Sequence, residues 1–315
     1  MLKMSTEPKP RIALNGPTMG TRWCAVFFAA APADALTMAL QAAVDGVDAT
    51  MSTWKTDSDL MRLNRTPPGV WFNASPALCA VVALALQIGS ASNGAFDIGV
   101  GGAVNAWGFG AAGTQPDTAA IAAISAQRLA GGSVEVDLAA NRLRRIASVQ
   151  LDLCGIAKGY GVDQLAEVLI REGIGDFIVS IDGEVRALGT RPDGSGWIVG
   201  LERADHDQRA LARTIAVSDM AIATSGDYRH WHRYGDTKVS HTIDPRTGVP
   251  LQNLLCAVTV TAEHCVVADA WATALLVLGE RDGPATARQY GLDALFTMRS
   301  GRGLQEFGVG AFAAA

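Results

Sequence analysis

The chain has 315 residues, of which 49% are hydrophobic and 18% charged, and its formal net charge is −5. This length and composition are those of a globular protein with a large core, built as one domain with an insertion or as two small domains. The negative charge argues against nucleic acid as the main partner. An anionic ligand must therefore be met by local groups.

The cysteines indicate a reducing compartment. There are five of them, an odd number, and none forms a C-x-x-C pair, which favours buried free thiols. The apolar run at residues 24–31 follows a proline-bearing stretch, which is the wrong place for a secretory signal. The apolar run at residues 77–88 is too short to span a bilayer. We therefore expect a cytoplasmic protein with no membrane span.

The N-terminal third is expected to be mainly helical. Residues 1–10 are polar and proline-bearing, which predicts a disordered N-terminus, and residues 11–315 are expected to form a single domain with an N-terminal helical part. A strand is predicted at residues 23–29, and an amphipathic helix follows at residues 33–52. A short helix is predicted near residues 60–64.

The next segments are predicted as helices separated by glycine-rich and turn sequences. A helix at residues 75–90 ends in a loop at residues 93–102, which lacks the G-x-G-x-x-G of a dinucleotide-binding fold. Another helix is predicted at residues 121–129. Residues 134–149 are expected to form a hairpin that turns at residues 139–141.

Residues 151–163 are the stretch around which the chain is organised. Leu151 and Leu153 alternate with Asp152, which predicts a strand, and small residues then lead into a helix that runs to about Leu169. Backbone N–H groups at a helix N-terminus beside Lys158 suit a phosphate. The spacing is not that of a P-loop, so the alternative remains that the glycines only ease the crossover from strand to helix and bind no ligand.

Strands dominate the following part of the chain. Residues 176–189 predict two strands joined by a bend at Asp182 and Gly183, and residues 221–228 predict a strand that runs into a turn. The other elements are predicted as strands at residues 197–201, 214–218 and 258–261, a helix at residues 266–278 and a final pair of strands.

Asp269 and Thr273 are the candidate metal ligands. They are four residues apart on the predicted helix at residues 266–278, so both side chains lie on one face, among alanines. Two hard oxygens in a small-walled niche suit Mg²⁺, which also engages waters and phosphate. The alternative is that Asp269 interacts with the helix dipole and that Thr273 bonds back to a carbonyl.

Four further residues have two interpretations each. His241 precedes a rigid turn beside Asp244, so it is a candidate acid or base or a packed side chain. Arg246 is placed to meet a phosphate or to pair with Asp244. Trp54 and Phe96 are candidates for stacking on a flat ring, although aromatic residues usually belong to the core.

Taken in order, these segments resemble the ApbE-type flavin transferases, a family of FAD:protein FMN transferases. The resemblance covers about residues 17–280, and any single block is a weak signal, whereas all of them in the same order are a strong one. The matching blocks are residues 19–21, 51–64, 94–97, 151–163, 224–228, 240–241 with 244–248, and 268–270 with Thr273.

The resemblance implies an α+β, T-fold-like architecture, a mixed sheet with flanking helices, and an activity. The activity is Mg²⁺-dependent cleavage of FAD, with FMN passed to a Thr or Ser hydroxyl of an acceptor flavoprotein and AMP released. The metal would be held by Asp269, Thr273 and a backbone carbonyl at Gly155, and His241 or Asp244 would take the acceptor's proton. FAD would contact Met19, Trp54, Ala95, Phe96, Asp97, Asp152, Lys158 and Ile243.

Two alternative activities and one departure from the family pattern remain. An FAD pyrophosphatase would use the same site with water as the nucleophile, and a flavin carrier would hold FAD without turnover. Where the family commonly has a glycine pair, this chain has Asp182 and Gly183. A carboxylate that points into the site there would repel phosphate.

Overall fold

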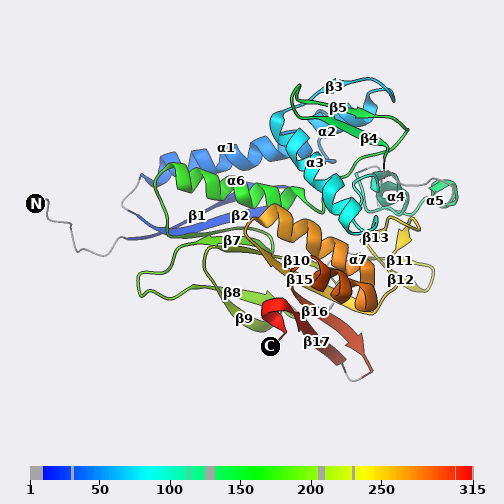
Figure 1. Cartoon of the computed structure of the whole chain (residues 1–315). Coiled ribbons are helices and arrows are strands. Elements are labelled where there is room, and N and C mark those ends of the chain that lie inside the picture. The colour runs from blue at the N-terminus through cyan, green and yellow to red at the C-terminus, as the bar shows by residue number, and fades with distance from the viewer. Residues whose placement is uncertain are drawn as a thin grey trace, which may run out of the picture.

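An eight-stranded antiparallel sheet forms the centre of the computed structural model (Figure 1). The structure describes residues 10–29, 32–111, 113, 115–124, 132–204, 210–228, 231–301 and 303–313, so the predicted disorder of residues 1–9 lies outside the described residues. The strands are, in spatial order, β1 (Arg11–Thr18), β2 (Thr21–Phe28), β6 (Phe177–Ile181), β7 (Glu184–Leu188), β10 (Met220–Gly226), β15 (Leu255–Ala262), β16 (Asp293–Ser300) and β17 (Gly303–Val309).

Helices cover one face of this sheet, and α1, α6 and α7 lie along it in Figure 1. The apolar positions of α1 that the sequence predicted to share one face, among them Leu36, Leu40 and Val44, are buried there. The helices are α1 (Ala33–Met51), α2 (Asp59–Arg65), α3 (Pro76–Ala91), α4 (Gly101–Ala106), α5 (Thr118–Ile124), α6 (Ala157–Arg171) and α7 (Cys265–Gln289), with a 3₁₀ turn η1 (Gly310–Phe312).

Small sheets surround the central one. The hairpin of β8 (Trp197–Glu202) and β9 (Leu211–Val217) packs Trp197 and Val199 against the other face of the large sheet. A three-stranded sheet of β3 (Phe72–Asn73), β4 (Val134–Asp137) and β5 (Arg142–Arg145) lies over α2 and α3 in Figure 1. The remaining pairs are β11 (Trp231–Tyr234) with β12 (Thr237–Ser240) and β13 (Ile243–Asp244) with β14 (Val249–Pro250).

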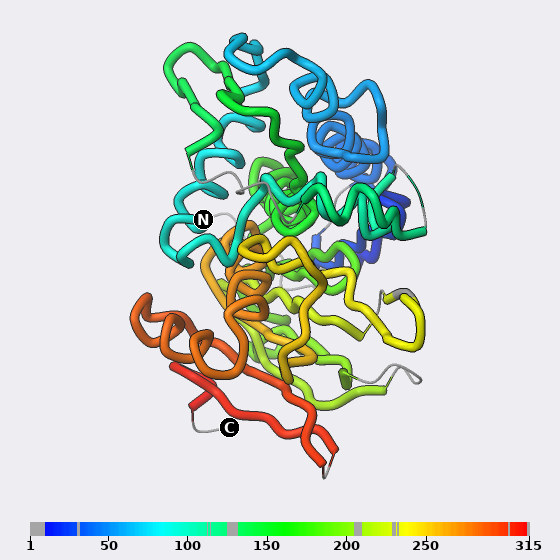
Figure 2. Tube along the Cα trace, turned by 90° about the vertical axis from the view of Figure 1, so that its right-hand side faces the viewer, coloured from blue at the N-terminus to red at the C-terminus, as the bar shows by residue number. Residues whose placement is uncertain are grey.

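The segment of β11 to β14 is held beside α4. Ile243 packs with Ala103 and Trp107, and the Trp107 indole N–H donates to the Gly248 carbonyl at 2.9 Å. Figure 2 shows this segment, in yellow, next to the teal trace of α4 and α5. A turn late in the chain is therefore fixed against the N-terminal helical part.

The predicted fold class is confirmed, because the structure is α+β with helices flanking a large sheet. The sheet itself was expected to be mixed, whereas all its neighbouring strands pair antiparallel. The turn at residues 139–141 and the bend at residues 182–183 are also confirmed, since Asn141 and Asp182 both have positive φ between paired strands. Strand β1 was not predicted. Among the described residues, no helix has the length and apolarity needed to cross a membrane.

The predicted strand at residues 151–153 is wrong, because the segment has no strand partner. Asn64 of α2 takes the place of a neighbouring strand: its amide Nδ2–H donates to the Leu151 carbonyl at 2.9 Å and its Oδ1 accepts from the Leu151 N–H at 2.8 Å. The Asp152 N–H donates to the Ile98 carbonyl at 2.7 Å. The backbone is therefore satisfied without a strand ladder.

Helix α7 is interrupted just after the predicted helix at residues 266–278. Gly279 has φ 81° and ψ −174°, which is not helical, and a second helical stretch follows it to Gln289. A residue with a Cβ is strained at this φ, so glycine suits the position. The break separates the buried, alanine-rich first part of α7 from the rest.

Candidate active site

One cavity gathers residues from distant parts of the chain. It has a volume of about 1080 Å³ and is bordered by the β1–β2 turn, the α3–α4 loop, the start of α6, the β6–β7 turn, the segment after β12 and the first part of α7. Every site residue named from the sequence lines it, except Asp244 and Arg246. The lining candidates are Met19, Trp54, Ala95, Phe96, Asp97, Asp152, Gly155, Lys158, His241, Ile243, Asp269 and Thr273.

Two tight turns at the cavity hold non-glycine residues in the left-handed region. Met19 and Gly20 have φ 45° and 72° between the paired residues Thr18 and Thr21, as a two-residue hairpin turn with the twist of its strands requires. Asp182 has φ 57° in the β6–β7 turn. Asp tolerates this conformation better than most residues and glycine adopts it without cost, which explains why glycine suits the same position.

Lys158 is the cation of the cavity. Its Nζ lies 2.7 Å from Glu184 Oε1 and 3.7 Å from Asp182 Oδ2. Burial acts to lower the pKa of Lys158, but the nearby carboxylates of Glu184, Asp269 and Asp182 outweigh burial and raise this pKa above its ordinary value. The ammonium group is thus held in its charged form, and the Asp182 carboxylate lies beside a positive charge.

Asp269 is a buried carboxylate, only 4% exposed, and its Oδ2 accepts from the Gly159 N–H at 2.9 Å. Burial, followed by the charge of Glu184, raises the pKa of Asp269 to about 7. Its partner Thr273 shares a hydrogen bond with Ser225, with 2.8 Å between the two hydroxyl oxygens. Thr273 is therefore hydrogen-bonded to strand β10, a contact that the alternative of a bond back to a carbonyl of its own helix does not include.

The two predicted halves of the metal site meet in the cavity. A Cβ built on Gly155 would lie 3.4 Å from Thr273 Oγ1, so the turn before α6 touches α7 at the threonine. Within the described residues, no three His, Cys, Asp or Glu side chains are grouped as metal ligands. A metal ion here would need hydroxyl, carbonyl and phosphate oxygens beside the one carboxylate, and such hard donors fit Mg²⁺.

The two aromatic candidates differ in exposure. Trp54 is 65% exposed in the loop between α1 and α2, whereas Phe96 is 4% exposed and its N–H donates to Ser92 Oγ at 3.0 Å. A flat ring has access to the Trp54 indole. Phe96 instead forms part of the wall.

Comparison with known proteins identifies the family of this chain. The model of the ApbE family matches residues 19–296. The FAD:protein FMN transferase of Vibrio cholerae serotype O1 is 36% identical over 312 residues, which are 97% of this chain and 93% of that protein. The chain belongs to the ApbE family. The FAD:protein FMN transferase of Klebsiella pneumoniae is 34% identical over 93% of this chain and 85% of its own length.

Solved ApbE structures have the same fold. The flavin transferase ApbE from Vibrio cholerae superposes with a TM-score of 0.86 at 33% identity and covers 98% of this chain and 99% of its own. The apo form of the Pseudomonas stutzeri flavinyl transferase ApbE superposes with a TM-score of 0.88 at 32% identity, over 99% of this chain and all of its own. The resemblance inferred from the sequence is confirmed.

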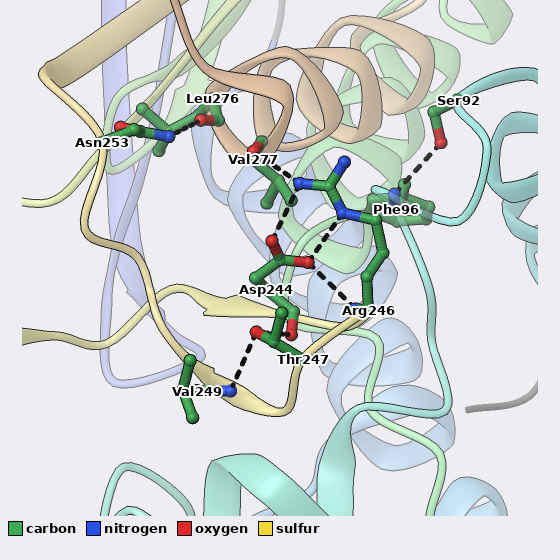
Figure 3. Close-up of polar contacts among 9 residues, drawn as sticks. All are labelled: Ser92, Phe96, Asp244, Arg246, Thr247, Val249, Asn253, Leu276 and Val277. Atoms are coloured by element: carbon green, nitrogen blue, oxygen red, sulfur yellow. Dashed lines mark hydrogen bonds and ion pairs between the residues drawn. The ribbon is translucent and has the colours of Figure 1, made fainter. Parts of the chain in front are cut away.

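In this ApbE-family chain Asp244 does not line the cavity but braces the turn behind it (Figure 3). Both carboxylate oxygens of Asp244 accept from the Arg246 guanidinium, at 2.9 and 2.8 Å, and Oδ1 also accepts from the Arg246 N–H. Arg246 Nη2 donates further to the Val277 carbonyl at 3.3 Å. Of the two interpretations of Arg246, pairing with Asp244 is the one observed.

His241 lies in the cavity wall that this turn supports. It lines the cavity together with Thr242 and Ile243, and its ring meets the Phe109 ring edge-on, with 6.4 Å between centroids. The structure thus places the histidine at the cavity and the neighbouring carboxylate behind it. Of the two candidate bases, only His241 therefore lines the cavity.

Two residues of the site were not singled out from the sequence. Glu184 is 2% exposed and bonds to Lys158, and Ser225 bonds to Thr273. Glu184 directly follows the predicted bend at residues 182–183, and this position in the sequence could have identified it as a site residue. For Ser225 the sequence showed a strand running into a turn, but its partner depends on how β10 lies against α7.

Proposed function

We propose that the chain is an Mg²⁺-dependent FAD:protein FMN transferase, which cleaves the FAD pyrophosphate, attaches FMN to a Thr or Ser hydroxyl of an acceptor protein and releases AMP. The observation that carries the proposal is the meeting of Gly155, Asp269 and Thr273 in the cavity that also holds the candidate FAD contacts. The names of the ApbE relatives support it. The cytoplasmic location stays a prediction from the sequence.

The proposed metal ligands are Asp269, Thr273 and the Gly155 carbonyl. Bound Mg²⁺ would neutralise charge that develops on the phosphoryl oxygens. Lys158 adds a fixed positive charge, because Glu184 and Asp182 keep it protonated and in place. Phosphoryl transfer mainly requires positioning of the reactants and neutralisation of charge. The proposed metal ligands and Lys158 are groups of the types that supply both.

In the proposed transfer step, the acceptor hydroxyl attacks the pyrophosphate of FAD. The acceptor hydroxyl gives its proton to His241, and its oxygen forms a bond to the phosphorus on the FMN side of the pyrophosphate. The bond from that phosphorus to the bridging oxygen breaks, and AMP leaves with this oxygen. We assign the base role to His241 rather than to Asp244, because His241 lines the cavity while Asp244 is engaged by Arg246.

The test is product analysis with and without an acceptor. The purified protein is incubated with FAD and Mg²⁺, alone or with co-expressed candidate acceptors, and AMP is followed by chromatography while acceptors are analysed by mass spectrometry. FMN added to Thr or Ser, with matching AMP release, supports the transferase.

The two rival activities give other products. Rapid release of AMP and free FMN without an acceptor would identify a pyrophosphatase. Binding of FAD with neither product would identify a flavin carrier.

A further inference from the structure

Helices α6 and α7 cap one another at the cavity. The carboxylate of Asp269 on α7 accepts from the Gly159 N–H in the first turn of α6 at 2.9 Å. In return, Asp163 on α6 accepts from the first two N–H groups of α7, with Oδ1 3.0 Å from the Cys265 nitrogen and Oδ2 2.9 Å from the Val266 nitrogen. We call these five residues the α6–α7 latch.

Neither helix caps itself with a side chain. The N-cap residues are Ile156 for α6 and His264 for α7, and neither makes a side-chain capping bond. The first N–H groups of a helix have no partner within it, and a local Ser, Thr, Asp or Asn usually supplies one. Here each helix obtains its cap from the other, so the two starts are tied to a fixed relative position.

The latch also requires close contact between the helices. A Cβ at Gly159 would lie 2.5 Å from the Cys265 carbonyl oxygen and 2.7 Å from Asp269 Cβ, well inside van der Waals contact. Any larger residue would push α7 away from α6. The helix that carries two proposed ligands therefore lies directly against the one whose preceding turn carries the third.

Arg186 of β7 completes the arrangement. Its Nη1 lies 2.9 Å from Asp163 Oδ1, and both side chains are at least nine-tenths buried. A buried ion pair gives little net stability, because desolvation offsets the attraction, whereas a local serine cap would have satisfied α7 without buried charge. Arg186 is two residues from Glu184, the partner of Lys158, so the same strand anchors both the latch and the cation of the cavity.

From these contacts we infer that Asp163 is a positioning residue for the metal site. It holds the start of α7 against α6 so that Asp269 and Thr273 face Gly155. The inference rests on the metal site of the proposed function and goes beyond it by assigning a role to a residue that does not line the cavity. A merely structural cap would lower stability without changing affinity for the metal.

The test uses Asp163→Asn and Mn²⁺ as an electron paramagnetic resonance probe of metal binding. The amide oxygen can accept from only one of the two N–H groups, and the amide NH₂ faces the other donor, so α7 shifts. Loss of a group that orients a ligand lowers metal affinity by about tenfold or more. We expect a Kd for Mn²⁺ that is about tenfold higher, with FAD binding in the absence of divalent metal unchanged.

The matched control is Ser75→Ala. Ser75 caps α3, where its Oγ accepts from the Leu78 N–H at 3.2 Å, away from the cavity. This substitution removes a helix cap and is expected to lower Tm without changing the affinity for Mn²⁺. Should Asp163→Asn fail to fold, Arg186→Lys keeps the charge but loses the guanidinium geometry, and it is expected to weaken Mn²⁺ binding in the same direction.

The Mn²⁺ affinities of the wild type and the variants distinguish the positioning role of Asp163 from the metal site itself. A wild-type protein that binds no Mn²⁺ even in the presence of FAD would overturn the proposed metal site and this inference with it. If the wild type binds Mn²⁺ and a folded Asp163→Asn or Arg186→Lys protein binds it equally well, the positioning role is overturned while the metal site stands. Equal loss of affinity in Ser75→Ala would also overturn it, because general destabilisation would then explain the effect.

Discussion

Two walls of the cavity are held in different ways. The wall that carries the proposed metal ligands, which we call the metal wall, is formed by the start of α6 and the first part of α7. It is largely buried, and bonds between carboxylates and backbone N–H groups fix it. The histidine wall, residues 241–248, is partly exposed, and a side-chain pair of Asp244 and Arg246 braces it against the Val277 carbonyl.

This contrast predicts different consequences of substitution. Backbone groups of packed helices cannot adjust independently, so changes in the metal wall are expected to act on metal binding. A turn braced by a partly exposed side-chain pair opens at a lower free-energy cost than a packed helix pair. Changes in the histidine wall are therefore expected to act on the rate of transfer, with metal and FAD binding retained.

The largest expected effect is that of Asp269→Asn. The amide oxygen keeps the bond to the Gly159 N–H, so the fold is retained, but the negative ligand is lost. We expect Mg²⁺-dependent AMP release to fall by about 1000-fold, because a metal contributes several kcal/mol to such a transition state. Rates are measured across a Mg²⁺ titration. Activity close to that of the wild type would remove Asp269 from the site.

His241→Ala is expected to have the next largest effect. Loss of a positioned base slows a step by about 100-fold or more. FAD affinity, followed by quenching of flavin fluorescence, and the Mg²⁺ dependence should stay as in the wild type, since the substitution lies in the other wall. Equal single-turnover rates for the variant and the wild type would end the candidacy of His241 as the base.

Arg246→Lys tests whether the brace supports the histidine. Lysine keeps the charge but loses the two parallel bonds to Asp244, and we expect transfer to slow by about tenfold. The matched control is Arg142→Lys, which alters a similar pair with Asp137 on β4 and β5, away from the cavity. If both variants slow transfer equally, the brace has no special connection with His241.

Ser225→Ala has the smallest expected effect and returns to the metal wall. It removes one hydrogen bond to Thr273, and we expect Mn²⁺ affinity to fall by about fivefold, the value of one such bond. Ser225→Thr keeps a hydroxyl and is expected to retain most of the affinity. A slower rate of transfer with unchanged Mn²⁺ affinity would contradict the division into two walls.

Local sequence was sufficient to predict the elements whose signals lie within them. The periodicity of α1 predicted that helix, and the helix predicted at residues 75–90 corresponds to α3. The turns at residues 139–141 and 182–183 were also predicted from the sequence. The strand prediction for residues 151–153 was wrong because their backbone partners are the Asn64 side chain and the Ile98 carbonyl. No pattern of alternation can reveal a partner of that kind.

The candidate site shows the same limit. The spacing of Asp269 and Thr273 placed both on one helix face, and the family resemblance supplied most of the cavity residues. The resemblance implied His241 or Asp244 as the base, yet the Asp244 side chain pairs with Arg246. Ser225 and Asp163 were missed as supporting residues because their roles depend on contacts across 48 and at least 102 positions of the chain.

The glycine break in α7 has a mechanical consequence. Two of the last carbonyls of the first part are capped from outside the helix: Asn253 Nδ2 donates to the Leu276 carbonyl at 2.8 Å, and Arg246 donates to that of Val277 (Figure 3). These two bonds of the first part therefore do not depend on the second part. The stretch after Gly279 still packs into the core through Pro284 and Ala287, but the break interrupts the helical hydrogen bonds, so we expect its amides to exchange with solvent separately from those of the part that faces the cavity.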